Sequence, residues 1–329
     1  MARIACLGGN METEMALQGL VEAGAPIVGI YCAHSDLQSQ ISDYAPIGDF
    51  AKDHAIPHLP ITDINSGEAR EFARAIDADH LFVLGWSQII GYEMLDCFPG
   101  GVVGSHPTPL PFGKGRAPVP WTILENRRRS AVTLFQMTSK VDEGRIVSMR
   151  WFDVPERAYA IDVYQLVAEN LRDSFVDLAG KLGDGLPEAL DSGLESSIYA
   201  RRTPADGWID FNASADAVDR LVRAASHPYP GAYAYREGQR VAFHRVEPAS
   251  EVDRSYHGQP GQVLRKRKGM VLVQCGDLPL WLGNPNEDAT WDTTYGQISL
   301  GSRFGRRVDD DLHGFDERLA RIERQLGII

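Results

Sequence analysis

The chain has 329 residues, of which 43% are hydrophobic and 24% are charged. This length suggests two domains, with enough apolar content to bury a core in the larger one. The formal net charge of −12 disfavours a large nucleic-acid partner, because phosphate binding usually needs a concentrated basic face. The four cysteines have no paired spacing, so composition predicts neither a zinc site nor a disulfide framework and fits a reducing cytoplasm.

The amino-terminal residues form an apolar strand pattern directly, without a basic leader and a long apolar region. No stretch approaches the roughly 18 consecutive apolar residues of a membrane span. We therefore expect a cytoplasmic protein that is not exported and has no membrane partner.

Short apolar strands and longer helical patterns alternate along the first half of the chain. This alternation predicts an α/β fold, with a Rossmann-like parallel sheet in the amino-terminal domain. The predicted strands are 4–7, 28–31, 80–84, 101–103, 131–137 and 145–152, and the predicted helices are 12–23, 47–54, 68–76 and 161–182. A further helical stretch is predicted to begin at Trp121.

Two glycines, Gly8 and Gly9, and then Asn10 follow the first predicted strand. The spaced glycine pattern of a dinucleotide site is absent, so they are only a weak nucleotide-binding signal. Backbone amides at the start of the next helix could still hold a phosphate. Gly9 and Asn10 are therefore candidate substrate-binding residues.

One histidine stands where a predicted strand meets a proline-rich loop. His106 is followed by Pro107, which biases it away from helix, and by two further prolines that keep the chain extended. The strand 131–137 leads to a loop that carries Asp142. If the two strands are parallel neighbours, both side chains leave the same carboxyl edge and can form a proton-handling pair. The alternative is a structural histidine and an ordinary turn.

The strand 80–84 ends in Gly-Trp-Ser-Gln-Ile-Ile, residues 85–90. Backbone amides, a hydroxyl and a carboxamide at a strand end suit a flat heteroaromatic ring with many donors and acceptors.

Several motifs in a specific order resemble the formyltransferase family that uses 10-formyltetrahydrofolate. They are His106-Pro-Thr-Pro-Leu-Pro, Gly115-Arg-Ala-Pro, Val132-Thr-Leu and Asp142-Glu-Gly-Arg-Ile-Val. The resemblance covers roughly residues 1 to 283. It implies a catalytic domain at 1–200 and a smaller OB-like β-barrel domain at 201–283. The remaining residues, 284–329, are predicted from their own pattern to form an irregular tail that ends in a helix, and the resemblance says little about them.

The resemblance also implies site residues. His106 and Asp142 match the family's catalytic histidine and aspartate, but its asparagine is Gly104 here. We hypothesise that the amide of Gln88 replaces it, the alternative being that Gln88 only caps the following turn. The expected folate site comprises Trp86, Ser87, Gln88, Ile89, Pro109, Leu110, Val141 and Asp142. The expected substrate site comprises Gly9, Asn10, Ser105, Thr108, Lys114 and Arg116.

The chemistry implied is the attack of an uncharged primary amine on the formyl carbon. Protonated His106 would stabilise the oxygen that becomes negative, while Asp142 would hold the imidazole or carry the amine proton. No metal is expected, since no metal-ligand cluster is visible in the sequence.

The second half contains a glycine- and proline-rich linker, 183–204, and then a helix, 215–225. The short strands 241–246, 261–264, 270–275 and 278–282 indicate a small β barrel. Basic runs at 127–129, at a predicted helix end, and at 265–268, at a hairpin tip, are solvated by default, and the second is the better case for RNA. An amphipathic helix, 315–326, could pack on the barrel or form a homodimer contact.

The acceptor is predicted from two local features. Arg201-Arg-Thr-Pro and Pro228-Tyr-Pro-Gly-Ala resemble the family members that act on nucleotide-linked amino sugars. The stretch 33–49 has no Lys or Arg, whereas methionyl-tRNA formyltransferases carry a basic insertion there. We therefore expect a nucleotide-linked amino sugar of a surface polysaccharide. Methionyl-tRNA formyltransferase and a non-catalytic folate-binding module are the alternatives.

Overall fold

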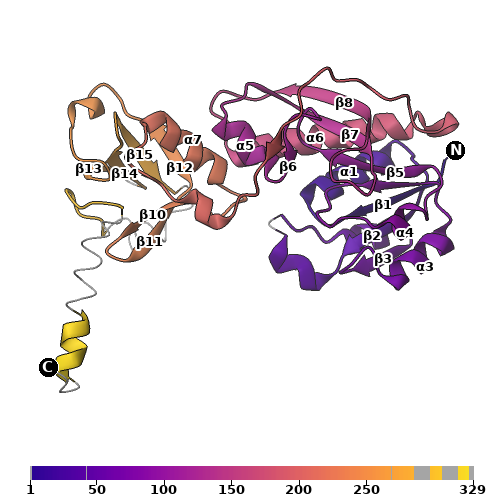
Figure 1. Cartoon of the computed structure of the whole chain (residues 1–329), viewed down its shortest axis with the longest axis horizontal. Coiled ribbons are helices and arrows are strands. Elements are labelled where there is room, and N and C mark those ends of the chain that lie inside the picture. Colours follow the sequence, from indigo (N-terminus) through magenta and orange to yellow (C-terminus); the bar gives the residue numbers. More distant parts are fainter. Residues whose placement is uncertain (1, 42, 268, 285–296, 306–317, 326–329) are drawn as a thin grey trace. The chain divides into compact units, whose positions relative to one another are not determined.

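The computed structural model describes residues 2–41, 43–267, 269–284, 297–305 and 318–325. The chain divides into two compact units, Met1–Arg202 and Thr203–Ile329 (Figure 1).

A seven-stranded sheet, in the order β3-β2-β1-β4-β5-β7-β8, forms the centre of the first unit. The strands β1 to β5 pair in parallel, which confirms the expected Rossmann-like arrangement. The strand bounds are β1 Ile4–Gly8, β2 Ile27–Ala33, β3 His58–Ile61, β4 His80–Val83, β5 Gly101–His106, β7 Arg129–Gln136 and β8 Arg145–Asp153.

The last two strands correct one prediction, because β5 and β7 are antiparallel and not parallel. His106 lies opposite Thr133, and Val103 lies opposite Gln136. A parallel connection needs a crossover that carries the chain back along the sheet. The connection between β5 and β7 contains a two-residue strand, β6, Lys114–Gly115, and the seven-residue helix α5, Pro118–Leu124. Neither carries the chain back along the sheet, so β7 begins near the edge at which β5 ends.

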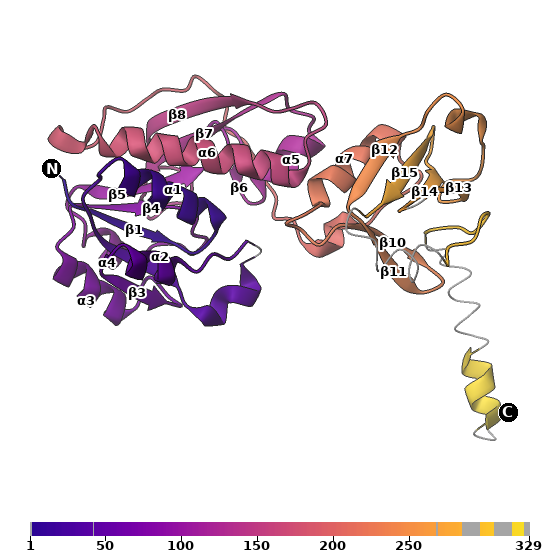
Figure 2. The ribbon, with the colours of Figure 1, turned by 180° about the vertical axis from the view of Figure 1, so that it is seen from behind.

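Helices cover both faces of this sheet. Helices α1, Met11–Glu22, and α6, Ala160–Ala179, pack together on one face (Figure 2), and α3, Gly67–Ile76, and α4, Tyr92–Leu95, lie on the other. Helix α2, Ile47–Asp53, contacts the edge strand β3 and its neighbour β2. Side-chain caps explain two of the helix starts, since Asn10 caps α1 and Ser66 caps α3.

Two sequence boundaries differ from the prediction. Helix α5 begins at Pro118 and not at Trp121, because proline is tolerated in the first turn of a helix. Arg129 belongs to β7 and not to a helix end. Arg127 and Arg128 follow the end of α5, and Arg128 and Arg129 are exposed, so only the assignment of Arg129 to a helix end is corrected.

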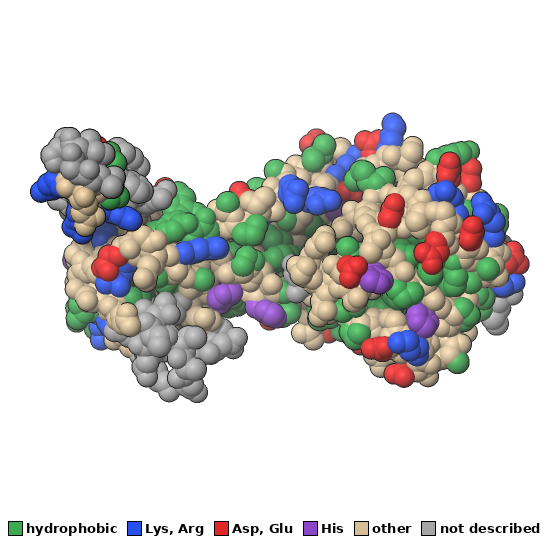
Figure 3. Space-filling model, turned by 90° about the horizontal axis from the view of Figure 1, so that it is seen from below, with side chains coloured by type: hydrophobic (Ala, Val, Ile, Leu, Met, Phe, Trp, Pro, Cys, Tyr) green, Lys and Arg blue, Asp and Glu red, His purple; other side chains and the backbone are tan. Residues whose placement is uncertain are grey.

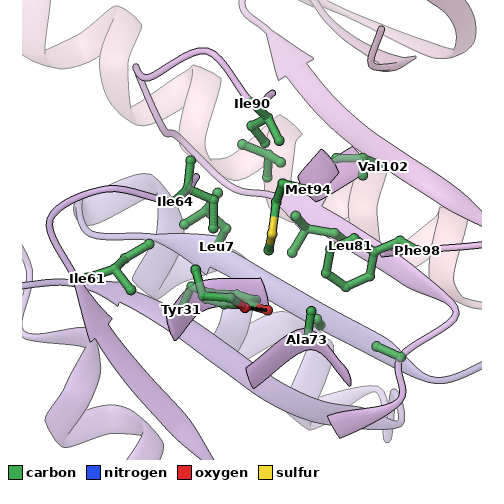
Figure 4. Packing of buried hydrophobic residues seen from close by; sticks show 14 of the residues in the cluster. Leu7, Tyr31, Ile61, Ile64, Ala73, Leu81, Ile90, Met94, Phe98 and Val102 are labelled. Atoms are coloured by element: carbon green, nitrogen blue, oxygen red, sulfur yellow. Dashed lines mark hydrogen bonds between the residues drawn. The ribbon is translucent and has the colours of Figure 1, made fainter. Parts of the chain in front are cut away.

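The core beneath α3 and α4 fixes the positions of the strand ends. Leu7 and Leu81, on the neighbouring strands β1 and β4, point toward Met94 of α4 (Figure 4). Tyr31 is fully buried, and its hydroxyl donates to the carbonyl of Ala69 at 3.1 Å. Each such side chain contributes about 1.5–3 kcal/mol through burial, which holds the carboxyl edge of the sheet in place.

The predicted linker belongs largely to the first unit. Strand β9, Ile198–Tyr199, pairs in parallel with β6, Lys114–Gly115. The indole of Trp121 donates to the carbonyl of Ala200 at 3.0 Å. This segment therefore braces the loop that follows His106.

The second unit contains helix α7, Ala215–Ala225, and two antiparallel sheets. The sequence pattern missed β10 and merged β11 and β12 into one strand, although the chain leaves the strand at His244. One sheet pairs β10, Ala232–Arg236, with β11, Gln239–Phe243. The other sheet has four strands in the order β12-β15-β14-β13. Their bounds are β12 Arg245–Pro248, β13 Val263–Arg267, β14 Met270–Gln274 and β15 Pro279–Gly283.

The basic run at 265–268 is built into this sheet. Arg265 forms an ion pair with Asp253 at 2.5 Å, and Arg267 forms one with Glu247 and lies 4.3 Å from the ring centroid of Trp281. Lys268 lies outside the described residues. The two arginines are therefore engaged in the fold, which removes the main argument for RNA contact at this hairpin.

Part of the predicted irregular tail is also built into the second unit. Ile298 and Phe304 are buried, and the amide of Phe304 donates to the carbonyl of Gly261 at 2.8 Å. A helix covers 318–325, with the side chains of Leu319 and Ile322 about half exposed. The rest of the predicted helix 315–326 lies outside the described residues, and its dimer contact stays a prediction.

Candidate active site

His106 is the last residue of β5 and is buried, with 6% of its surface exposed. Its Nε2 lies 2.9 Å from the carbonyl oxygen of Gly113. A carbonyl can only accept, so Nε2 carries a proton in this hydrogen bond. Nδ1 is consequently the nitrogen left for chemistry, and it faces Asp142 Oδ1 at 3.8 Å.

Asp142 reaches His106 although the two strands are antiparallel. The loop 137–144 folds back over the sheet edge, and Oδ2 of Asp142 accepts a hydrogen bond from the amide of Gly115 at 2.9 Å. Gly144 permits this return, because a Cβ there would lie 1.8 Å from the carbonyl oxygen of Gln136. The second carboxylate oxygen is thereby held toward the imidazole.

The loop after His106 is rigid because its polar groups bond within the fold. Thr108 Oγ1 donates to the carbonyl of Phe112 at 2.7 Å, and Thr133 Oγ1 donates to the carbonyl of Thr108 at 2.6 Å. Pro109 and Leu110 are buried, so their side chains belong to the core of the loop. Only their backbone remains for the folate contact expected from the sequence.

Met137 lies where a side chain at position 104 would project. Gly104 and His106 are two residues apart on β5 and share one face. A Cβ on Gly104 would lie 2.9 Å from the sulfur of Met137. A thioether therefore stands beside His106 in place of the expected amide.

Gln88 does not supply the missing amide in this structure. Its Nε2 donates to the carbonyl of Thr62 at 2.6 Å, and its Oε1 accepts from the amide of Ile64 at 3.3 Å. The side chain thus ties the loop 85–90 to the segment after β3. The hypothesis that Gln88 substitutes for asparagine beside His106 is contradicted by these bonds.

The loop 85–90 and the Asp142 loop each expose an apolar side chain. Ile89 is 63% exposed and Val141 is 57% exposed. Trp86 is half-buried against the core, and its Nε1 is buried without a hydrogen-bond partner among the described residues. Ser87 is exposed. These loops therefore present apolar surface with an unused donor close by.

Two of the expected substrate-binding residues are engaged in the fold instead. Asn10 accepts from the amide of Thr13 at 3.1 Å and donates to Tyr164 at 3.3 Å. The amides of Gly9 and Asn10 both donate to Thr13 Oγ1, so they are not available to hold a phosphate. Thr108 is likewise committed to its own loop.

Three other candidates for the substrate site lie near the catalytic pair in the chain. Lys114 Nζ is 3.6 Å from a carboxylate oxygen of Glu143, the neighbour of Asp142. Arg116 is exposed, and Ser105 is half-buried on β5. The structure thus brings Lys114 to the Asp142 loop.

One charged residue at this edge was missed by the sequence analysis. Glu12, in the first turn of α1, is only 9% exposed. Burial, together with the nearby carboxylate of Asp43, raises the pKa of Glu12 to about 7. Tyr164 bridges this group, since its hydroxyl donates to Asp43 at 2.7 Å. The only sequence feature that could have pointed to Glu12 is its position just after the first predicted strand and the helix cap Asn10.

The part of the chain that the structure describes holds neither a metal-ligand cluster nor a membrane-spanning helix. No group of three or more histidine, cysteine or acidic side chains there could hold a metal ion. Within the same ranges, no helix is long and apolar enough to cross a membrane.

Two family models match the chain. The model described as "Formyl transferase" matches residues 10–177, and that described as "Formyl transferase, C-terminal domain" matches residues 201–288. The first match includes both His106 and Asp142.

Solved structures with similar folds include three kinds of protein. HypX from Aquifex aeolicus in complex with tetrahydrofolic acid has 20% identity and a TM-score of 0.62, over 85% of this chain and 43% of that chain. This chain therefore spans less than half of HypX. An N-formyltransferase from Helicobacter canadensis, in complex with folinic acid and dTDP-3-aminofucose, has 15% identity and a TM-score of 0.62, over 86% and 99%. Methionyl-tRNA formyltransferase from Clostridium thermocellum has 18% identity and a TM-score of 0.55, over 75% and 93%.

Proposed function

The chain belongs to the formyl transferase family, and from this we propose that it transfers a formyl group from 10-formyltetrahydrofolate to the primary amine of a nucleotide-linked amino sugar. The observation that carries the proposal is the pairing of buried His106 with Asp142 at the sheet edge, 3.8 Å apart. Both residues lie in the segment that the family model matches.

The residues around this pair fit a reduced folate. A pterin is a flat ring with many hydrogen-bonding edges, and it needs apolar contact above and below with donors at its rim. Ile89 and Val141 offer exposed apolar side chains, and the buried Nε1 of Trp86 has no acceptor among the described residues. Ser87 and the backbone of the loop 85–90 add polar groups. When bound there, 10-formyltetrahydrofolate would supply the activated formyl group.

The protein's own part in the reaction follows from the two nitrogens of His106. Nε2 is bound to the carbonyl of Gly113, which fixes the ring and leaves Nδ1 to donate a hydrogen bond to developing negative charge. Asp142 stabilises the protonated imidazole and can accept the proton that the acceptor amine loses. The amide of Gly115 holds the other carboxylate oxygen, so the carboxylate cannot rotate freely.

The presence of Met137 makes the proposed formyl transfer depend more strongly on His106. Its thioether fills the space beside Gly104 and offers no N–H donor. Removal of His106 should therefore leave no neighbouring amide side chain to take over at this position.

Charge favours a sugar nucleotide over tRNA. Acidic side chains are spread over the face of the first unit seen in Figure 3, and the basic ones lie singly among them. The two arginines that marked the best candidate for RNA contact are paired with Asp253 and Glu247. The Helicobacter canadensis enzyme, crystallised with dTDP-3-aminofucose, is matched over 99% of its length. Lys114 and Arg116 are the proposed contacts for the pyrophosphate.

The test is a direct assay of the full chain with 10-formyltetrahydrofolate. One set of reactions contains a panel of nucleotide-linked amino sugars, and the other contains charged initiator tRNA. Mass spectrometry then reports the formyl increment on each acceptor. The His106→Asn variant is the control for uncatalysed transfer.

We expect at least one sugar nucleotide to be formylated by the wild type only, with the tRNA unchanged. Formylation of tRNA alone would contradict the proposed acceptor while retaining the reaction. Folate binding without transfer to any acceptor would instead identify a folate-binding module.

A further inference from the structure

A cavity of about 120 Å³ lies against the loop that follows His106. Its lining comes from that loop, from α5 and the turn after it, from β7 and β8, and from the segment that carries β9. Thr108 and Pro109 belong to the loop, whereas Trp151 belongs to β8 and Tyr199 to β9. All lining residues are in the first unit, and neither His106 nor Asp142 is among them.

The charge of this cavity is opposite to that of the whole protein. Arg127 and Arg129 line it, and no acidic residue does, although the chain has a net charge of −12. Arg127 is paired with Glu125 at 2.6 Å. Arg129 forms no ion pair with any residue that the structure describes, so its guanidinium can bind an anion.

The walls beside these cations are aromatic. The guanidinium of Arg127 lies 3.9 Å from the ring centroid of Phe112, and that of Arg129 lies 4.8 Å from the ring centroid of Trp151. Tyr199 completes the wall and stacks on Trp121 with a centroid distance of 5.4 Å. One face of Phe112 and one face of Trp151 are thus covered by guanidinium groups, and one face of Tyr199 is covered by Trp121. The remaining faces and edges of the rings offer apolar contact to a flat ligand ring.

Two hydroxyl groups also line the cavity, but their protons are used within the fold. Thr122 and Ser130 are buried, and their hydroxyls donate to the carbonyls of Pro118 and Pro107. The cations of the cavity are therefore the groups that can bind an anion. Arginine recognises carboxylates through two parallel hydrogen bonds, which distinguishes a planar oxyanion from a neutral ring. The combination of an arginine fork and aromatic walls therefore suits one ligand class.

We propose that this cavity is a second ligand site, separate from the catalytic pair, that binds a small aromatic carboxylate. Arg129 binds the carboxylate, while Trp151 and Tyr199 contact the ring. Because Thr108 and Pro109 form one wall, the ligand rests against the loop whose Gly113 carbonyl holds His106.

The test measures benzoate binding to the full chain by calorimetry, without folate or acceptor. This readout does not depend on formyl transfer. We expect one benzoate per chain, and binding weakened about tenfold or more by Arg129→Gln, since the variant loses a charge-assisted fork. Arg128→Gln is the matched control, because Arg128 pairs with Glu156 at 2.7 Å outside the cavity.

Two comparison ligands separate the contributions of charge and ring. Benzyl alcohol keeps the ring without the carboxylate, and inorganic phosphate keeps the charge without the ring. Both should bind more weakly than benzoate to the wild type. The proposal is overturned if benzoate does not bind, if Arg128→Gln weakens binding as much as Arg129→Gln, or if either comparison ligand binds as tightly as benzoate.

Discussion

Replacing Asp142 with asparagine tests whether its charge is required for catalysis. Asp142 has a backbone φ of 52°, a left-handed conformation that asparagine adopts more readily than most residues. Asparagine can also accept the hydrogen bond from Gly115, so the loop should keep its shape. The variant then removes the negative charge and little else.

The expected loss follows from the distance between the two groups. The side chains of His106 and Asp142 are 8% and 12% exposed and 3.8 Å apart. With an effective dielectric constant of about 20, attraction between an imidazolium and a carboxylate at this distance is about 4 kcal/mol. A loss of that size in the transition state lowers kcat by about 1000-fold.

The assay is single-turnover formyl transfer, followed by mass spectrometry, to the acceptor that the wild type modifies. Glu143→Gln is the matched control, because Glu143 is the exposed neighbour that pairs with Lys114 and Lys140. It should change the rate by less than about threefold, as for other exposed ion pairs. An Asp142→Asn rate within tenfold of the wild type would refute the assigned role.

Three further predictions concern stability and the site loop. Gly144→Ala should destabilise the chain by about 1–3 kcal/mol and reduce formyl transfer, because the added Cβ would meet the carbonyl of Gln136. Gly183→Ala is the control, because a Cβ added there has no atom within 4 Å. Equal melting temperatures of the two variants would contradict the prediction. Glu12→Gln should stabilise the protein by on the order of 3 kcal/mol at pH 8 and by nothing at pH 4. The pKa of Glu12 is raised to about 7, so the cost of burying its ionised carboxylate in the folded state grows as pH rises from about 4.5 through 7. A difference in denaturant midpoint between wild type and Glu12→Gln that does not change with pH would argue against this prediction. Although burial opposes ionisation, hydrogen bonds led by that from Trp281 lower the pKa of Asp253 to about 2. The stability it contributes, on the order of 1–2 kcal/mol, is present above about pH 4 and lost as pH falls toward 2, so the difference between wild type and Asp253→Asn in melting temperature should shrink over that window.

Local patterns predicted the elements that local physics controls. The strands β1, β2 and β4 and the helices α1 and α3 were expected from apolar periodicity and end within a few residues of the predicted bounds. The site histidine was equally local, because a strand that meets Pro107 must leave His106 at the sheet edge. The order of motifs then marked Asp142 as its partner.

Long-range features were beyond these patterns. The sense of β7 relative to β5 depends on the path of the intervening chain, which no periodicity encodes. The destination of the Gln88 amide depends on where the segment after β3 lies. Arg265 and Arg267 looked like a solvated run until the fold brought Asp253 and Glu247 to them.

The sequence by itself therefore determined the α/β class, the family and the two residues of the proposed catalytic pair, because each depends on neighbours in the chain or on motif order. Only the tertiary structure decided which nitrogen of His106 is left for chemistry, what fills the space beside Gly104, and that Arg129 and Trp151 line one cavity. Each of these depends on contacts between segments far apart in sequence, such as Met137 against Gly104. Hydrogen bonds and packing of that kind exist only once the strands have taken their places in the sheet.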